Sequence, residues 1–199
     1  KFLIARRLMY WQVYLHKTVV SAENTLIKIL KRAKQLIQNG TDIFISSALK
    51  MFLKNNYTAN NFIKNDDILE TFSKLDDHDI YSCLKEWANH DDFILSSLSI
   101  RILNRKPLKI KTQNEKFSEK EINKLKQKVS EKYNISIDDT NYLVFTGKVS
   151  NNAYQYHKTH INILMKNGEI KDITDASDQF NIDALSKTVN KYFLCYPKI

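Results

Sequence analysis

Two tyrosines and two cations recur at helical spacing near the start of the sequence. Arg7, Tyr10, Tyr14 and Lys17 occupy positions i, i+3, i+7 and i+10, and a rotation of about 100° per residue gathers such positions on one stripe of a helix. Cations neutralise phosphate oxygens, and a phenol donates a hydrogen bond or stacks on a base. The stripe therefore predicts one wall of a site for a phosphate-bearing ligand. The alternative is that the stems cover apolar surface while the polar heads reach water.

A second basic run lies between residues 101 and 111. It holds five cations and no acidic residue, namely Arg101, Arg105, Lys106, Lys109 and Lys111. The run crosses the point where a helical pattern gives way at Pro107 to an alternating one. Junctions between subdomains are common ligand sites, and a basic junction favours a polyphosphate.

The charge of the whole chain is concentrated in the same two regions. The 199 residues are 43% hydrophobic, which is typical of a globular protein, and the formal net charge is +9. Residues 1–40 and residues 101–132 each carry a net charge of +7, whereas residues 41–100 carry −5. Two separate basic blocks indicate an anionic partner. Solvated lysine-rich helix faces are the other explanation.

The histidines and carboxylates favour capping over metal binding. His16, His78, Asp79 and Asp139 could be assembled into the His, His-Asp, Asp pattern of a divalent-metal phosphohydrolase. However, His78 and Asp79 fall in the first turn of a predicted helix, where carboxylates cap free N–H groups. We therefore expect these residues to cap helices and not to bind a metal.

Other classes are excluded by what the sequence lacks. It has no P-loop, GxSxG, GxGxxG or HExxH motif. Cys83 and Cys195 lie far apart inside apolar patterns, so both are expected in the core of a protein from a reducing, cytoplasmic setting. No apolar run approaches the roughly 20 residues of a membrane span, and the opening residues do not form a signal peptide.

The N-terminal half reads as helical. Helices are predicted at about residues 1–16, 18–39, 42–54, 66–74, 77–89 and 91–105. The first is apolar on nearly every side, which predicts a helix buried between layers. In the second, Ile29 and Ala33 belong to the apolar stripe, Lys28 and Arg32 to the wet face, and Gly40 ends the helix. Six aspartates fall where the later helices begin and are expected to cap them: Asp66, Asp67, Asp76, Asp77, Asp91 and Asp92.

The pattern changes to mixed α and β after Pro107. Strands are predicted at about 108–111, 142–149, 161–165, 170–173 and 192–196, and helices at 118–133 and 182–189. Asn167-Gly168 is expected to form a hairpin turn. If the short strand at 170–173, which forms one arm of this hairpin, is set aside, the order of elements is β-α-β-β-α-β, the ferredoxin-like arrangement. The predicted fold class is α+β, with a helical region at 1–106 and a small α+β domain at 107–199.

Several of these segments together resemble a known family. The run from Phe2 to Lys17, which ends in Tyr14-Leu15-His16-Lys17, and the junction from Asn104 to Lys109 are similar to bacterial HD-superfamily phosphohydrolases. That group is related to the deoxynucleoside triphosphate triphosphohydrolases. The acid-rich segment Leu75–Trp87 and the terminal Leu194–Lys198 add to the resemblance.

The resemblance implies a role for this chain beside a metal centre that it does not contain. In such enzymes a divalent ion such as magnesium or manganese is held by His, His-Asp and Asp ligands and activates the attacking water. Those ligands precede the segment that Phe2–Lys17 matches. The resemblance therefore implies a C-terminal portion that holds no metal ligand and no catalytic residue and is inactive alone.

The same resemblance assigns contacts to particular side chains. It places Arg105 and Lys109 near nucleotide phosphates, and Tyr14, His16 and Lys17 on the helix that lines the pocket or a regulatory site. The expected partners are a nucleotide resembling a deoxynucleoside triphosphate, as substrate or effector, and further copies of the same chain.

Two other functions stay open on the sequence alone. A basic β-α-β-β-α-β domain also describes RNA-recognition modules. The candidate strands Leu108–Lys111 and Ile161–Met165 lack the aromatic residues on which bases would stack. A non-catalytic assembly domain is the third possibility, in which the basic blocks contact a partner subunit.

Overall fold

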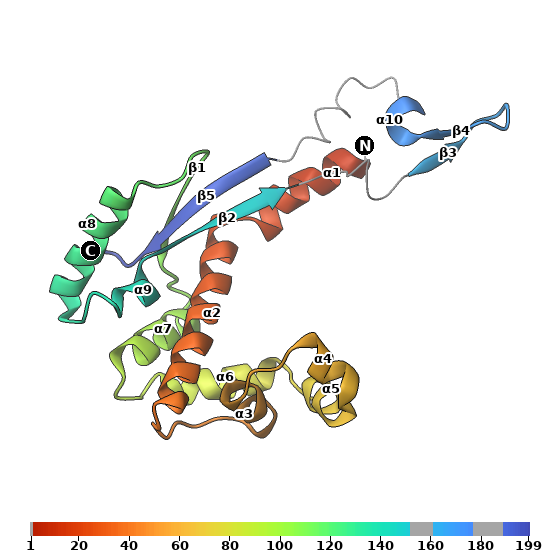
Figure 1. Ribbon diagram of the computed structural model, residues 1–199. Coiled ribbons are helices and arrows are strands. Elements are labelled where there is room, and N and C mark those ends of the chain that lie inside the picture. The colour runs from red at the N-terminus through yellow and green to blue at the C-terminus, as the bar shows by residue number, and fades with distance from the viewer. Residues whose placement is uncertain (1, 152–160, 177–188) are drawn as a thin grey trace. The chain divides into compact units, whose positions relative to one another are not determined.

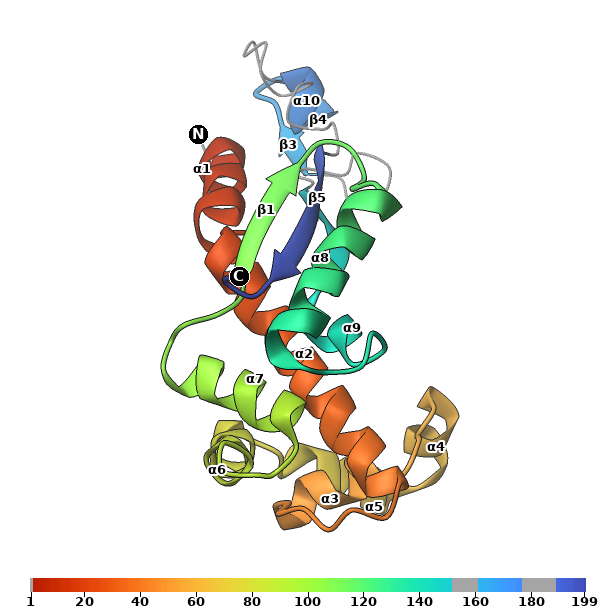
Figure 2. The same ribbon diagram turned by 90° about the vertical axis from the view of Figure 1, so that its left-hand side faces the viewer.

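The computed structural model describes residues 2–151, 161–176 and 189–199. The chain divides into two compact units. Unit 1 contains Lys1–Val20, Lys111–Ser118 and Thr146–Leu194, and unit 2 contains Ser21–Ile110, Glu119–Phe145 and Cys195–Ile199. The chain therefore passes between the units five times. Figures 1 and 2 show the elements in two views.

Unit 2 is largely helical. Its long helix α2 begins within unit 1, and shorter helices follow (Figure 1). The bounds are α2 Lys17–Gln38, α3 Ser47–Lys54, α4 Ala59–Lys64, α5 Asp66–Ser73, α6 Asp77–Trp87, α7 Phe93–Leu103, α8 Glu119–Tyr133 and α9 Thr140–Leu143. Within the unit, α6 packs on α3 and α7, α4 packs on α5, and α9 packs on α7 and α8.

The core of unit 2 forms where the apolar faces of these helices meet. Ile29 and Ala33 of α2 are fully buried, which confirms the predicted stripe. Trp87 of α6 is buried as well, and its Nε1–H donates to the carbonyl oxygen of Phe44 at 2.8 Å. Burying one large apolar side chain stabilises a fold by about 1.5–3 kcal/mol. The buried face of α2 that contains Ile29 and Ala33 therefore holds this helix in the core of unit 2.

The predicted helix ends are confirmed where they depend on local chemistry. Gly40 has φ +82°, and the N–H of Thr41 donates to the carbonyl of Leu36, which closes α2 in a Schellman turn. Asp76 accepts hydrogen bonds from the first-turn N–H groups of α6. Asp92 accepts from the N–H of Leu95 in α7 at 2.8 Å. Helix α4 was not among the predicted helices, because a helix of six residues is too short to show a clear apolar periodicity. It begins at a capping box formed by Thr58.

The described part of unit 1 combines helical and strand segments. Helix α1 spans Phe2–Met9 and continues as the π-helix η1, Tyr10–Tyr14. The strands are β1 Lys109–Gln113, β2 Phe145–Asn151, β3 Asn162–Leu164, β4 Ile170–Asp172 and β5 Val189–Tyr196, and α10 spans Ile173–Ala176. Residues 109–110 of β1, 145 of β2 and 195–196 of β5 belong to unit 2. One sheet has the order β1-β5-β2, and β3 pairs with β4 in a second sheet. Strand β2 approaches β5 closely at Gly147, which has no side chain. A Cβ added at this position would lie only 2.3 Å from the Phe193 ring.

The predicted α+β class is confirmed, since a helical N-terminal part precedes the strands. The strand pairing differs from one continuous ferredoxin-like sheet, because β3 and β4 pair with each other across the turn at Gly168. The segment 140–143 forms α9 where a strand had been expected to begin. The predicted helix at 182–189 lies almost entirely outside the described residues, and Val189 begins β5. The predicted boundary after residue 106 stays a prediction.

The expectation of a buried first helix is wrong. Leu8, Met9, Val13 and Tyr14 are each between 44% and 53% exposed. Their apolar character reflects a face that the described part of the chain leaves uncovered. Among the described residues, no helix is both long and apolar enough to cross a membrane.

Candidate functional site

A hollow of about 570 Å³ lies beside α1 and η1 in unit 1. Among the described residues, five side chains line it: Ala5, Arg6, Met9, Tyr10 and Tyr14. They follow one another at i, i+1, i+4, i+5 and i+9, so α1 and η1 together supply the described part of the wall. This part of the lining combines apolar surface, two phenols and one cation.

The aromatic and cationic groups of this hollow contact one another. The ring centres of Tyr10 and Tyr14 are 5.2 Å apart, and the planes are tilted by 54°. The guanidinium carbon of Arg6 lies 5.7 Å from the centre of the Tyr10 ring, within the range of a cation–π contact. Such a group offers ring faces to a planar ligand and a positive charge to an anion.

A π-helix carries both tyrosines of this hollow. The N–H of Leu15 donates to the carbonyl of Tyr10 at 2.7 Å, a bond from residue i+5 to residue i. This wider turn changes the phase of the helix after Met9, so a stripe worked out at 100° per residue does not hold. Arg6, Tyr10 and Tyr14 share the spacing i, i+4, i+8, and that signal could have identified Arg6 from the sequence.

The other residues predicted for this site, two from the stripe and His16 from the family resemblance, lie elsewhere. The carbonyl of Arg7 accepts a hydrogen bond from Asn151 Nδ2 at 3.3 Å. The Nδ1 of His16 accepts from the N–H of Thr18 at 3.3 Å, so His16 caps α2. Lys17 is the exposed first residue of α2. The structure thus brings Tyr10 and Tyr14 together at the hollow, and Arg7, His16 and Lys17 are not part of its lining.

The second predicted site, the basic junction, lies in unit 2 at the end of α7. The N–H of Lys106 donates to the carbonyl of Arg101 at 2.9 Å, and that of Arg105 donates to Ile102 at 3.1 Å. This is a Schellman turn in which Arg105 occupies the left-handed position at φ +53°. Glycine usually takes that position, so a strained backbone holds this arginine at the surface.

Lys109 lies three residues after Lys106, whose N–H closes the turn. The carbonyl of the buried Leu108 before it accepts a hydrogen bond from Ser21 Oγ at 2.8 Å, which anchors the strand start. Arg105, Lys106 and Lys109 are all exposed. The structure therefore leaves both predicted phosphate ligands, Arg105 and Lys109, available to solvent.

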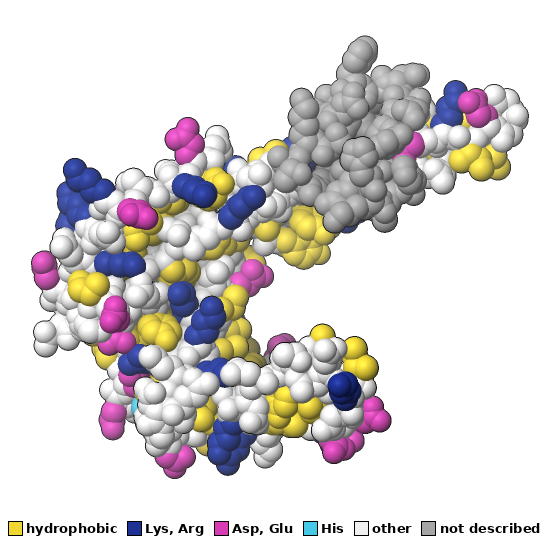
Figure 3. All heavy atoms as spheres, viewed as in Figure 1, with side chains coloured by type: hydrophobic (Ala, Val, Ile, Leu, Met, Phe, Trp, Pro, Cys, Tyr) yellow, Lys and Arg dark blue, Asp and Glu magenta, His cyan; other side chains and the backbone are white. Residues whose placement is uncertain are grey.

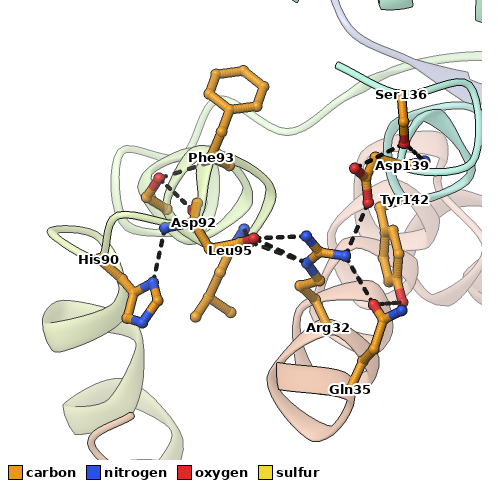
Figure 4. Close-up of polar contacts among 10 residues, drawn as sticks. Arg32, Gln35, His90, Asp92, Phe93, Leu95, Ser136, Asp139 and Tyr142 are labelled. Carbon is orange, nitrogen blue, oxygen red and sulfur yellow. Dashed lines mark hydrogen bonds and ion pairs between the residues drawn. The ribbon is translucent and has the colours of Figure 1, made fainter. Parts of the chain in front are cut away.

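A cluster of polar side chains in unit 2 surrounds Arg32 (Figure 4). Its guanidinium donates to both carboxylate oxygens of Asp92, with the shortest distance 2.6 Å, and to Asp139 Oδ1 at 2.9 Å. It also donates to Gln35 Oε1 at 2.8 Å, and that oxygen accepts from the Tyr142 hydroxyl at 2.9 Å. The placement of Arg32 on a wet helix face is therefore wrong, because its side chain is only 13% exposed.

The electrostatics of this cluster favour its charged form. Burial by itself would raise the pKa of Asp92, but the hydrogen bonds and charge of Arg32 outweigh it and lower that pKa below its ordinary value. The hydrogen bond to Asp92 raises the pKa of Arg32. Asp92 also caps α7, so Arg32 fixes the first turn of the helix whose last turn carries the basic junction.

The metal pattern considered in the sequence does not assemble. Asp139 is bound to Arg32 and to Ser136, and His78 is an exposed residue 3.5 Å from Asp76. Across the described residues, no group of three or more His, Cys, Asp or Glu side chains is arranged to hold a metal ion. The residues of this chain that the structure describes therefore do not fit the divalent metal that the family resemblance implies.

The two cysteines are core residues, as predicted. Cys83 and Cys195 are both free and fully buried. Burial raises the pKa of the Cys195 thiol to about 11 and also raises that of Cys83. Neither thiol is a ready nucleophile near neutral pH.

Comparison with known proteins adds two similarities. No protein-family model matches the chain. The chain is 29% identical over 205 residues to the uncharacterized protein YwfO of Bacillus subtilis, covering 99% of this chain and 44% of that protein. It is 46% identical to a phosphohydrolase from Bacteroides thetaiotaomicron, with a TM-score of 0.91 over 99% of this chain and 49% of that structure. The chain thus spans about half the length of both proteins.

Proposed function

We propose that this chain forms part of an HD-type phosphohydrolase that hydrolyses deoxynucleoside triphosphates. The observation that carries the proposal is the 46% identity to a phosphohydrolase across 99% of the chain. The hollow and the basic junction support it, because each presents cations to solvent beside groups that suit a nucleotide. In this proposal the divalent metal is held by residues other than those described here.

The hollow on α1 and η1 would contact the substrate. Arg6 would pair with a phosphate oxygen, because a guanidinium donates two parallel hydrogen bonds to such groups. The tilted pair Tyr10 and Tyr14 would hold the sugar or base by ring contact and by hydroxyl hydrogen bonds. The metal would supply an activated water, and the residues of this chain would orient the phosphates toward it.

The direct test is turnover by the protein at its natural length. Deoxynucleoside triphosphates are incubated with magnesium, manganese or cobalt, and the release of triphosphate or phosphate is followed. Arg6→Met keeps an apolar stem and removes the charge, and we expect kcat/KM to fall at least about tenfold, equivalent to about 1.4 kcal/mol. Lys64→Met, at an exposed position on α4, is the matched control and should leave kcat/KM unchanged. Absence of turnover with every nucleotide and metal would exclude the proposed activity.

Arg105 and Lys109 would bind nucleotide phosphates in unit 2, as substrate ligands or as ligands of a regulatory nucleotide. Arg105→Ala should weaken nucleotide binding while the circular dichroism spectrum stays that of the parent. Equal binding by Arg105→Ala and the parent would remove this residue from the proposal. We also propose that the protein works as a homo-oligomer, which sedimentation at several concentrations tests.

On the one face that Figure 3 draws, the charge pattern of unit 2 does not favour nucleic acid as the main partner. On the face drawn in Figure 3, lysine and arginine side chains alternate with acidic ones over the helices of this unit. A protein that follows a nucleic-acid backbone needs a continuous basic track. Titration with single-stranded RNA over a salt series separates the two functions, because phosphate-backbone binding falls steeply as salt rises.

A further inference from the structure

A separate hollow of about 460 Å³ runs along α7 in unit 2. It is lined by residues of one helix and of the turn that ends it. Phe93 and Ile100 form apolar wall, and Arg101, Asn104 and Lys106 lie among the lining residues from the last helical turn onward. The lining therefore combines an apolar surface with two cations.

The apolar part of the hollow is open to solvent. Phe93 is 39% exposed and Ile100 is 43% exposed. The ring of Phe93 packs against Tyr133 of α8 with ring centres 5.4 Å apart, and in Figure 4 it points away from the Arg32 guanidinium. This contact holds the ring in place without covering its accessible side. A flat or aliphatic ligand body could thus gain hydrophobic contact here.

The cationic end is built by the Schellman turn. The bond from the N–H of Lys106 to the carbonyl of Arg101 folds the chain back on the helix, so both cations belong to one turn. The left-handed backbone of Arg105 is what permits this reversal. Asn104 adds an amide that can donate a hydrogen bond.

The side chain of Arg101 is incompletely satisfied. Its Nε atom is buried and has no hydrogen-bond partner in the described structure. An unpaired buried donor is costly, and such a group calls for an explanation. An oxyanion in the hollow could draw the guanidinium toward it and accept a hydrogen bond from this N–H. The side chain would lose no hydrogen bond from Nε when it moved, so the free-energy cost of the movement is lowered.

We propose that this hollow binds a small phosphate monoester with an aromatic or aliphatic body. The phosphate would lie between Arg101 and Lys106 near the Asn104 amide, and the body would lie on Phe93 and Ile100. The site shares the basic junction with Arg105 and Lys109 and is distinct from the hollow on α1 and η1, and it does not depend on the proposed hydrolysis of nucleotides. The two cations select the phosphate, and the apolar wall selects against inorganic phosphate.

The test uses 4-fluorophenylphosphonate, which cannot be hydrolysed, with the full-length protein. Binding is followed by fluorine NMR of the ligand and by calorimetry. We expect inorganic phosphate, which lacks the body, and 4-fluorophenol, which lacks the charge, each to bind at least about tenfold more weakly. Equal affinity for inorganic phosphate would overturn the role of the apolar wall, and equal affinity for the phenol would overturn the role of the cations.

Variants locate the site. Lys106→Met and Arg101→Met should each raise the Kd about tenfold, and Ile100→Asn should raise it several-fold. Lys85→Met on α6 is the charge-matched control and should leave Kd unchanged. Lys106 is exposed, so its variant tests the proposal even if Arg101→Met does not fold.

One further variant separates this proposal from the proposed hydrolase activity. Arg6→Met should leave phosphonate binding unchanged. Binding that is lost in Arg6→Met but kept in Lys106→Met would place the ligand in the other hollow and overturn the inference.

Discussion

The guanidinium of Arg32 joins two carboxylates that enter unit 2 from distant parts of the chain. Asp92 lies 60 residues from Arg32 in sequence and Asp139 lies 107 residues away. The side chains of Arg32 and Asp92 are 13% and 14% exposed, so water screens their charges only weakly. The cluster therefore ties α2 to the beginnings of α7 and α9.

Removing the Arg32 charge should destabilise the protein strongly. In Arg32→Met, two partly buried carboxylates lose their cation, and we expect the free energy of unfolding to fall by about 3 kcal/mol. The matched control is Lys31→Met, at an exposed neighbouring position, which should change it by less than about 0.5 kcal/mol. Urea denaturation measures both. Equal stability of the two variants would show that the cluster adds nothing to the fold.

The acid side of the stability curve should depend on Asp92. Its pKa in the folded protein is below the ordinary 3.8, so its contribution is complete above that value and is lost as the pH falls through the folded pKa. Asp92→Asn keeps an acceptable helix cap but removes the charge. We expect the variant to lose less stability between pH 5 and pH 2 than the parent, as thermal unfolding would show. Asp91→Asn should follow the parent curve.

At the scale of single elements, two helix ends use the same backbone conformation with different residues. Gly40 closes α2 at φ +82°, and Arg105 closes α7 at φ +53°. A left-handed conformation costs a residue with a Cβ about 1–2 kcal/mol, and glycine escapes that cost.

Opposite substitutions at these two ends should have opposite effects. Arg105→Gly should raise the free energy of unfolding by up to about 1 kcal/mol while it weakens nucleotide binding. Gly40→Ala should lower the free energy of unfolding by about 1 kcal/mol. Chemical denaturation of both variants gives the comparison. If Arg105→Gly destabilises the protein, the side chain of Arg105 contributes more to the fold than its backbone costs.

The close approach of β2 to β5 gives a second prediction for elements. A methyl group at Gly147 would meet the Phe193 ring at 2.3 Å, so Gly147→Ala should destabilise the protein by about 1–3 kcal/mol through overpacking. The double variant Gly147→Ala with Phe193→Leu relieves the clash and should recover part of that loss beyond additivity. Thermal melts of the single and double variants test this pairing of strands.

Local elements were predictable because their causes are local. The caps by Asp76 and Asp92 and the stop at Gly40 follow from residues within a turn of the helix end. The π-helix at Tyr10–Tyr14 was not predictable from spacing, whereas the i, i+4, i+8 relation of Arg6 to Tyr10 and Tyr14 was present in the sequence. The role of Arg32 depends on partners that only the tertiary fold brings near, and the pairing of β3 with β4 depends on a competition between strands.

At the scale of the whole molecule, both units are assembled from segments on either side of residue 106. In unit 2, Ser21 Oγ donates to the carbonyl of Leu108 at 2.8 Å, and residues of α8 and α9 complete the same unit as α7. The charge blocks are likewise divided, since the basic residues 1–40 and 101–132 each contribute to both units.

Pieces cut at residue 106 should therefore not fold separately. We expect residues 1–106 and 107–199, each expressed alone, to show weak protection in hydrogen exchange and no cooperative unfolding transition, because each lacks segments that unit 2 requires. The intact chain over the same residues is the control. Two cooperative transitions from the separate pieces would confirm the boundary predicted from the sequence.

The five passages of the chain between units also bear on how such a protein can change over evolutionary time. A body made from one continuous stretch can be duplicated or exchanged between genes as a cassette, but neither unit here is a continuous stretch. New length is best accepted in loops that return to the body they left, such as the turn between β3 and β4 at Gly168. Recombination between related genes within residues 1–199 should preserve the fold only when all the segments of a unit come from the same parent.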